Sequence, residues 1–299
     1  MLDCAIIGGG PAGLSAALVL GRSRRNVVLF DDNQARNKVT HESHGFLTRD
    51  GVKPSELREI ARRDLAKYPS VELRDVSIAQ ASRQADGTFL LTTRQNEHVR
   101  ARKIILATGL KDILPDIAGL KAFYGQTLFS CPYCDGWEIR DQPLVVISEQ
   151  PHAYHMAITA SNWSMDLAVC TNGVDALTAE QIAKLASKGI RTYSQRIAEL
   201  QGREGKLENI VFADGTALPR AAGFVGGQLA HAAPIPEMLG CAINGKGGIV
   251  VDELGKSSVE GVYAAGDNAI VSPSQIVISA AGGTRAAMGV NSALTFEDF

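Results

Sequence analysis

The sequence predicts an α/β protein with two domains, the second inserted in the first. Residues 2–32 read as strand, glycine-rich turn, helix and strand, a βαβ unit that belongs to a parallel sheet. A similar unit begins near residue 143, and a further strand–turn–helix closes the chain. The length of 299 residues also favours two domains, at roughly 100–200 residues each. We therefore expect two dinucleotide-binding, Rossmann-like domains.

The remaining segments follow the same alternation. Residues 54–67 start with Pro and Ser and have helical periodicity. Apolar and β-branched runs predict strands, and periodic runs with a glycine stop predict helices. The expected strands after the first unit are 71–83, 87–95, 97–109, 143–148 and 166–173, with further strands in 191–195, 197–215 and 223–227, and the expected helices are 152–164, 178–189 and 278–294.

Composition is that of an ordinary globular protein. Hydrophobic residues make up 45% and charged residues 21%, with a net charge of −2 that gives no basic surface for nucleic acid. No apolar run reaches the roughly 20 residues needed to span a bilayer, and the amino terminus lacks the charged region of a signal peptide. We expect a cytoplasmic protein that does not bind membranes.

The first candidate site is the turn of residues 8–13, GGGPAG, which fits the pattern G-x-G-x-x-G. Gly8 permits the tight turn, Gly10 lets the backbone approach a pyrophosphate, and Gly13 lets helix and strand pack closely. Asp31 ends the next strand, 18 residues later, where its carboxylate can accept from ribose hydroxyls. Pro11 and Ala12 open the helix whose free N–H groups face the phosphates.

The turn alone does not choose between FAD and NAD. The far end of the chain does, because residues 262–267, VYAAGD, strongly resemble the segment of two-domain flavoenzymes whose aspartate meets the ribityl side of FAD. By that resemblance Gly266 and Asp267 bind FAD, and Gln275 and Ile276 open a helix whose positive end faces the flavin. Two halves more than 200 residues apart then form one discontinuous FAD domain.

The second candidate site is Cys131-Pro-Tyr-Cys134, a C-x-x-C motif. In a reducing compartment such a pair is redox-active or binds metal, and a helix start favours a low thiol pKa. A zinc site needs two more ligands, and no second Cys or His pair stands at zinc spacing, so we expect no metal. His152 and His155 are surface or core histidines in this interpretation, and Cys4 and Cys241 are buried, inert thiols.

The motifs GGGPAG, VVLFDD, ATG, CPYCDG and YAAGD, in this order and spacing, resemble the low-molecular-weight thioredoxin reductases over nearly the whole chain. The resemblance implies an FAD domain of residues 1–113 and 237–299 and an inserted redox domain of residues 114–236. It also implies a homodimer. The implied FAD-binding residues further include Asn37, Thr108 and Gly109.

The same resemblance assigns the redox chemistry. Cys134 is the sulfur that faces the flavin C4a, and Cys131 exchanges with the substrate. Asp135 is the acid/base that moves protons during exchange. The alternative for Asp135 is a carboxylate that caps the start of a helix, and the two roles do not exclude each other.

The chain departs from the family at its NADPH site. The family carries a second G-x-G-x-x-A and a basic cluster there, whereas this chain has Ser148, Glu149 and Gln150 in the turn. Side chains block close backbone approach, and one carboxylate about 5 Å from a phosphate costs roughly 3 kcal/mol at a dielectric of about 20. The next strand ends in residues 170–173, CTNG, without an arginine for a 2′-phosphate. We expect no NADPH binding in the family's manner.

Two flavin–dithiol functions remain. In one, a ferredoxin-like protein or another donor reduces the flavin, and electrons leave through the cysteines to a thioredoxin-like protein. In the other, a small dithiol substrate reduces the cysteines and oxygen reoxidises the flavin. Segments around Arg36-Asn37 and His44-Gly45-Phe46 resemble such dithiol oxidases, although those often carry His where this chain has Asp135. An FAD-binding redox sensor without catalytic activity is the alternative from another class.

Overall fold

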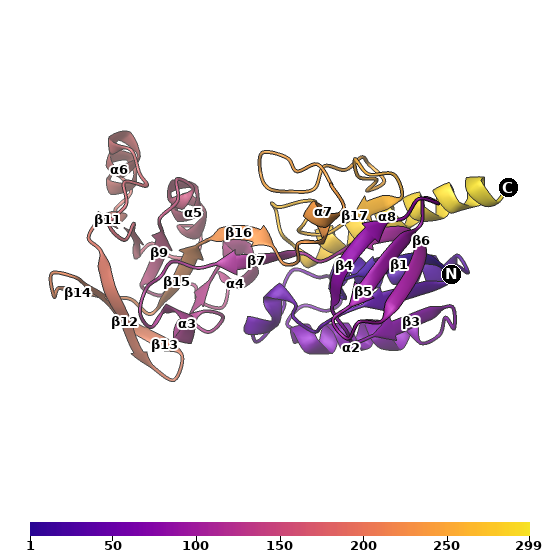
Figure 1. The fold of residues 1–299 in the computed structure, drawn as a ribbon. Helices are drawn as coiled ribbons and strands as arrows, with labels where there is room; N and C mark the ends of the chain where they lie inside the picture. Colours follow the sequence, from indigo (N-terminus) through magenta and orange to yellow (C-terminus); the bar gives the residue numbers. More distant parts are fainter. The chain divides into compact units, whose positions relative to one another are not determined.

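The computed structural model describes all of residues 1–299, and the chain divides into two compact units (Figure 1). The first unit consists of Met1–Lys38, Gly45–Lys111 and Leu229–Phe299, and the second of Val39–His44 and Asp112–Gln228. The chain returns to the first unit at Leu229, whereas the sequence places that boundary at residue 237. The reason is helix α7 (Ile235–Met238), which packs on strand β4 (Ile78–Arg83) and buries Ile235 in the core of the first unit.

The first unit contains a seven-stranded sheet in the order β3-β2-β1-β6-β5-β4, with β17 also paired to β6. Strand β6 is long enough to pair with two strands along the edge opposite β1, because residues 98–101 pair with β5 and residues 104–106 pair with β17. Strands β1, β2, β3, β6 and β17 run parallel, and β4 and β5 form the antiparallel edge. The strands are β1 (Leu2–Ile7), β2 (Val27–Phe30), β3 (Val71–Arg74), β5 (Phe89–Thr93), β6 (His98–Leu106) and β17 (Val262–Ala264).

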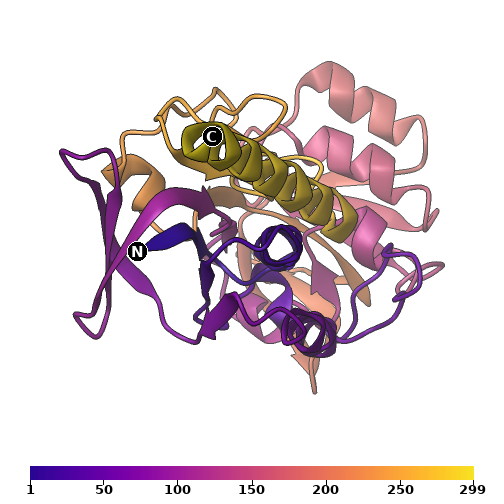
Figure 2. The same ribbon diagram turned by 90° about the vertical axis from the view of Figure 1, so that its right-hand side faces the viewer.

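Strand β1 is buried on both faces from Cys4 to Ile7, where its sequence is wholly apolar. Cys4 and Ile6 lie in one core cluster, and Ala5 and Ile7 in another. Helices α1 (Pro11–Arg22) and α8 (Ile276–Asp298) pack together on the first of these faces, where α8 is the long yellow helix in Figure 2. They approach so closely that a Cβ on Gly283 would collide with the carbonyl of Ala12. No helix, α8 included, combines the length and apolar character needed to cross a lipid bilayer.

The first unit also contains further helices, and two strands link it to the second unit. Helix α2 (Pro54–Leu65) packs against α1, and the one-turn 3₁₀ helix η1 (Arg36–Val39) follows strand β2. Strands β7 (Leu110–Ile113) and β16 (Gln228–His231), in which the chain passes from one unit to the other, pair as a two-stranded ribbon.

The second unit is built on a five-stranded parallel sheet in the order β11-β10-β9-β15-β8. A separate antiparallel sheet in the order β12-β13-β14 packs beside it, with Leu200 and Ile210 in the shared core. The strands are β8 (Leu128–Phe129), β9 (Leu144–Ser148), β10 (Leu167–Cys170), β11 (Arg191–Tyr193), β12 (Ile197–Arg203), β13 (Lys206–Phe212), β14 (Ala217–Pro219) and β15 (Ala222–Gly226). The helices are α3 (Leu120–Phe123), α4 (Pro132–Asp135), α5 (Ala153–Ala160) and α6 (Ala179–Ala186).

Helix α5 is shorter than its sequence pattern predicts, since it ends at Ala160 and not at residue 164. The chain turns there because Trp163 packs on Gly136, just after helix α4. A Cβ on Gly136 would lie 2.7 Å from the Trp163 ring. This contact ties the segment after α5 to the segment that carries the two close cysteines.

Candidate active site

The glycine-rich turn joins β1 to α1 at the carboxyl edge of the sheet. Gly8 has φ +108°, and a Cβ there would collide with the carbonyl of Ala107. A Cβ on Gly13 would collide with the carbonyl of Gly8, so both glycines are required by packing. Gly10 differs, because it is the extended N-cap of α1 and a Cβ on it would meet no protein atom within 4 Å. The space over Gly10 is therefore free to admit a pyrophosphate at the start of α1.

Pro11 and Ala12 are the first residues of α1, as the sequence predicts. Asp31 follows β2 and is 7% exposed, and its carboxylate lies against Gly9, where a Cβ would be 2.5 Å from Asp31 Oδ2. Arg62 approaches that oxygen to 3.5 Å as an ion pair, but Oδ2 accepts no hydrogen bond within the protein. A buried acceptor beside the turn fits a ribose hydroxyl.

The carboxyl end of β17 lies beside the first motif, because β17 pairs with β6 and β6 with β1. Gly266 takes φ +83°, and Asp267 Oδ1 accepts a hydrogen bond from Ser279 Oγ at 3.0 Å. The other oxygen, Oδ2, pairs with Arg36 at 3.4 Å. Gln275 is the N-cap of α8 and Ile276 its first residue, as expected.

Asn268 is a fully buried residue that sequence reasoning missed, although it directly follows Asp267. Its Nδ2 donates to the carbonyl of Leu106 at 3.2 Å and to Thr108 Oγ1 at 3.1 Å, while its Oδ1 has no partner. This amide holds Thr108 in place after β6. Gly109 follows with φ +68° and open space around its Cβ position. Asn37 is half-buried in η1.

Cys131 and Cys134 form a disulfide in the second unit, with their Cα atoms 5.3 Å apart. Cys131 is the N-cap of the single-turn helix α4, and its carbonyl accepts from the backbone N–H groups of Cys134 and Asp135 at 3.1 and 3.2 Å. Pro132 occupies the first helical position, where a missing N–H costs nothing. The two-residue spacing thus closes a small ring on a helix start, and the half-buried cysteines can exchange with a partner thiol.

A dinucleotide cradle and a redox disulfide in one chain are the pattern of a protein family. The profile described as pyridine nucleotide-disulphide oxidoreductase matches residues 2–283. The chain belongs to this family.

Known relatives narrow the subgroup of oxidoreductases. The crystal structure of TrxB of Bacillus anthracis, assigned as a thioredoxin reductase, is 42% identical and has a TM-score of 0.96, with 100% of both chains covered. Thioredoxin reductase tcpT of Claviceps purpurea is 33% identical over 284 residues, which cover 90% of this chain and 87% of that protein. A protein of Arthroderma benhamiae assigned as a thioredoxin reductase is 36% identical over 178 residues, but the match spans only 44% of its length.

These findings confirm the predicted fold class, with two Rossmann-like domains, and the predicted family. The enzyme is a thioredoxin reductase-like, FAD-dependent disulfide oxidoreductase. The open space at Gly10 and the Asp31 carboxylate oxygen that accepts no hydrogen bond fit the pyrophosphate and the ribose of FAD.

Filling the space over Gly10 tests whether the glycine-rich turn binds FAD. Gly10→Val is expected to lower FAD affinity at least roughly a hundredfold while the protein still folds, because the new side chain meets no protein atom but fills the pyrophosphate position. Gly245→Val is the matched control, since Gly245 also has open space and no left-handed backbone. The flavin-to-protein ratio after purification measures the effect. Full flavin content in Gly10→Val would contradict the assignment of the cradle.

Asp135 follows Cys134 directly and is 9% exposed. Burial, and after it the nearby carboxylate of Glu138, raise the pKa of its carboxyl group to about 7, and His44 opposes this rise. A carboxyl group with a pKa near neutrality can both give and take a proton at working pH. Such a value is compatible with the acid/base role expected of Asp135.

The remaining thiols of the oxidoreductase are buried and unpaired with each other. Burial raises the pKa of Cys4 and of Cys241, and it raises the pKa of Cys170 to about 12. Such thiols carry almost no thiolate at neutral pH. Thiol–disulfide exchange therefore belongs to Cys131 and Cys134.

The turn between β9 and α5 lies where a second dinucleotide would approach its domain, but the chain's own side chains fill it. Ser148 is fully buried, and its Oγ accepts from the N–H of Gln150 at 3.2 Å. A Cβ on Gly226 would lie 2.5 Å from both Ser148 Oγ and His152 Nε2. These two side chains therefore occupy the space over the carboxyl end of β15.

A hydrogen bond fixes the side chain of Glu149 at the same carboxyl edge of the sheet. Its Oε1 accepts from Asn172 Nδ2 at 2.6 Å, and Asn172 Oδ1 accepts from the N–H of Ile197 at 2.8 Å. The carboxylate is thus fixed at the carboxyl ends of β9 and β10, where the phosphates of a dinucleotide bind in this fold. Sequence reasoning identified the missing glycines, and the structure adds the side chains that take their place.

Proposed function

We propose that this enzyme passes electrons between FAD and the Cys131–Cys134 disulfide without taking them from NADPH. The observation that supports the proposal is the filled carboxyl edge of the second unit, where Ser148, Glu149 and His152 occupy the turn at which this fold binds a dinucleotide. Side chains exclude the ligand by volume, and the fixed carboxylate of Glu149 repels its phosphates.

Bound FAD supplies a two-electron acceptor and donor. The chain's own residues supply the exchange: a substrate thiolate attacks Cys131, the bond between the two sulfurs breaks, and Cys134 leaves as a thiolate. Asp135 gives the proton that the leaving sulfur needs and takes it back in the reverse direction. One dithiol is oxidised to a disulfide for each enzyme disulfide that is reduced.

The reductase direction is our first candidate. A ferredoxin-like protein or another reductant provides electrons to FAD, and a thioredoxin-like protein receives them at Cys131. Support comes from the relatives assigned as thioredoxin reductases. Asp135, in place of the histidine of many dithiol oxidases, also favours this direction.

The second candidate is an oxygen-dependent oxidase that forms a disulfide in a small dithiol. The filled dinucleotide edge favours it as well, because such an oxidase obtains its electrons from the substrate and needs no nicotinamide. The two candidates share every residue named above and differ in the direction of electron flow.

Anaerobic titration of the flavin tests the proposal. Micromolar NADPH is expected to leave the visible FAD absorbance unchanged, whereas dithiothreitol bleaches it through the cysteine pair. The dithiothreitol arm is the internal control, since it shows in the same sample that the flavin can be reduced. A reduced ferredoxin then distinguishes the donor of the reductase from the substrate of the oxidase. Rapid bleaching by micromolar NADPH would refute the proposal.

We further propose a cytoplasmic homodimer. Three free thiols beside one disulfide are typical of a reducing compartment.

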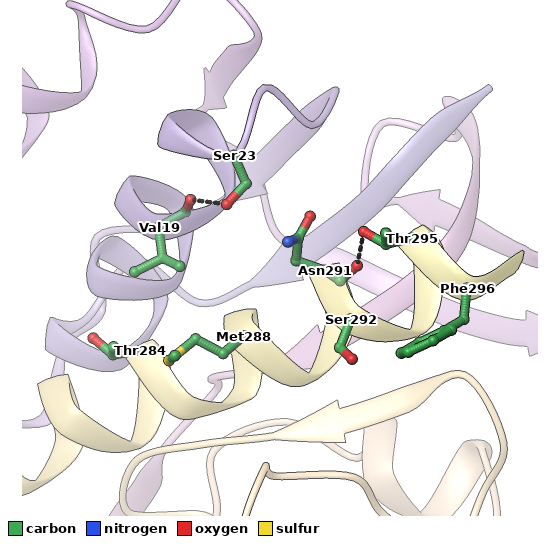
Figure 3. Close-up of a pocket in the computed structure, with 8 residues that line it drawn as sticks. All are labelled: Val19, Ser23, Thr284, Met288, Asn291, Ser292, Thr295 and Phe296. Atoms are coloured by element: carbon green, nitrogen blue, oxygen red, sulfur yellow. Dashed lines mark hydrogen bonds between the residues drawn. The ribbon is translucent and has the colours of Figure 1, made fainter. Parts of the chain in front are cut away.

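A groove of about 540 Å³ between α1 and α8 offers a surface for the second copy (Figure 3). Its hydroxyls at Ser23 and Thr295 donate to carbonyls of their own helices, and Met288 and Phe296 are 55% and 82% exposed. The mass of the holoenzyme in solution tests this assembly.

A further inference from the structure

A short segment far from the cysteines in sequence belongs to the unit that carries them. Residues Val39–His44 come between two stretches of the first unit but pack within the second. The backbone of Val39 lies so close to Gly125 that a Cβ on Gly125 would collide with it, and His41 Nε2 bonds to Gln126 Oε1 at 2.7 Å. These contacts fix the segment before it reaches His44.

His44 lies between two carboxylates. Its Nε2 is 3.7 Å from Glu42 Oε2 and 3.5 Å from Glu138 Oε1, and its side chain is 17% exposed. Glu138 stands three residues after Asp135, just beyond helix α4. His44 therefore contacts the first carboxylate that follows the acid/base residue in the chain.

We propose that His44 is a positioning residue for proton transfer at the disulfide, because its contact with Glu138 sets the charge that Asp135 faces. The inference rests on the proposed function, in which Asp135 is the acid/base of exchange. His44 itself need not touch the reacting sulfurs.

The charges around Asp135 support this role. Helix α5, which packs against α4, carries the titratable side chains Tyr154 and His155, and the segment Val39–His44 of the same unit also carries His41 and Glu42. Beyond burial, the groups that act on the Asp135 carboxyl are Glu138, which raises its pKa, and His44, which lowers it. Without His44, the carboxylate of Glu138 would act unopposed and Asp135 would keep its proton to a higher pH.

The test follows the reduction of the disulfide by dithiothreitol in the holoenzyme, with rates divided by the dithiothreitol thiolate concentration at each pH. In this step dithiothreitol is oxidised, the Cys131–Cys134 bond is reduced, and Asp135 protonates the leaving sulfur. The wild-type rate is expected to fall as pH rises through about 7, the pKa of Asp135.

His44→Gln removes the imidazole that opposes Glu138 and is expected to move this fall to higher pH, by on the order of half a pH unit or more. Glu138→Gln is expected to move it to lower pH, which provides a second and independent variant. His41→Ala is the matched control, because it removes a histidine of the same segment that contacts Gln126 and not Glu138. It should leave the midpoint unchanged.

The possible results distinguish a failure of the role proposed for His44 from a failure of the proposed function on which it rests. If Asp135→Asn keeps the fall near pH 7, the acid/base role of Asp135 is wrong. If Asp135→Asn abolishes the fall but His44→Gln and Glu138→Gln leave the midpoint in place, the proposed function stands and the role of His44 is wrong. Opposite shifts in the two variants, with none in His41→Ala, would establish it.

Discussion

Replacing Cys134 or Cys131 with serine is expected to lower disulfide exchange by at least about 10⁴-fold, because a hydroxyl cannot form the disulfide that carries the electrons. The two sulfurs are bonded to each other in the structure, and no other pair of thiols can replace them, since Cys4, Cys170 and Cys241 are buried and apart. Steady-state exchange with dithiothreitol measures the loss. Cys241→Ser is the control and should keep wild-type activity, as its side chain remains beside Ser257.

The two variants should also differ from each other. With Cys134 replaced, Cys131 remains to attack a substrate disulfide and cannot be released, so a stable mixed disulfide is expected. With Cys131 replaced, the substrate should not be trapped. Mass spectrometry after incubation with an oxidised thioredoxin or a small disulfide detects the mixed disulfide in each variant. Trapping only in Cys131→Ser would reverse the assigned roles.

The second large effect is expected at Asp135. Asp135→Asn should slow exchange by about 10²–10⁴-fold, the usual contribution of a positioned acid or base, and should remove the rate change near pH 7. The amide has nearly the same shape as the acid but carries no exchangeable acidic proton. Rapid-mixing rates across pH measure both features. Asp141→Asn, a change in an exposed carboxylate six residues further on, serves as control.

The same substitution should alter stability with a defined sign. The pKa of Asp135 is raised from 3.8 to about 7 in the folded protein, so between these pH values the folded state binds a proton that the unfolded state has released. The free energy of unfolding of the wild type therefore falls as pH rises through this window, by about 4 kcal/mol in all. Asp135→Asn should lack this part of the fall. Denaturant unfolding at both ends of the window measures it, and identical pH dependence in the two proteins would contradict the raised pKa.

Local motifs were the part of this protein that sequence reasoning could predict. The turn of residues 8–13 and the Cys131–Cys134 pair are each complete within a few residues, and the structure shows the helix starts that both imply. The carboxyl edge of the second unit was recognised from absent glycines, again within one short turn. Periodicity also predicted a helix over residues 278–294, and α8 extends beyond that range at both ends.

Contacts between distant segments could not be predicted in the same way. His44 lies 90 residues before Cys134, and nothing in its spacing indicates that it meets Glu138. The bonds of Asp267 to Arg36 and Ser279 depend on how strand order brings three segments to one edge. The position of Asn268 directly after Asp267 is a local signal for a site residue. Its hydrogen bond to Thr108, however, follows only from the pairing of β17 with β6.

The second unit is assembled from two separate stretches of chain, and this affects how it could be isolated. A gene fragment that encodes only residues 112–228 would retain the disulfide and Asp135 but would omit Glu42 and His44. Transplanting the redox centre into another scaffold would require grafting the six-residue stretch 39–44 as well. Any redesign that shortens the loop after η1 would change the chemistry of a carboxyl group encoded some ninety codons downstream.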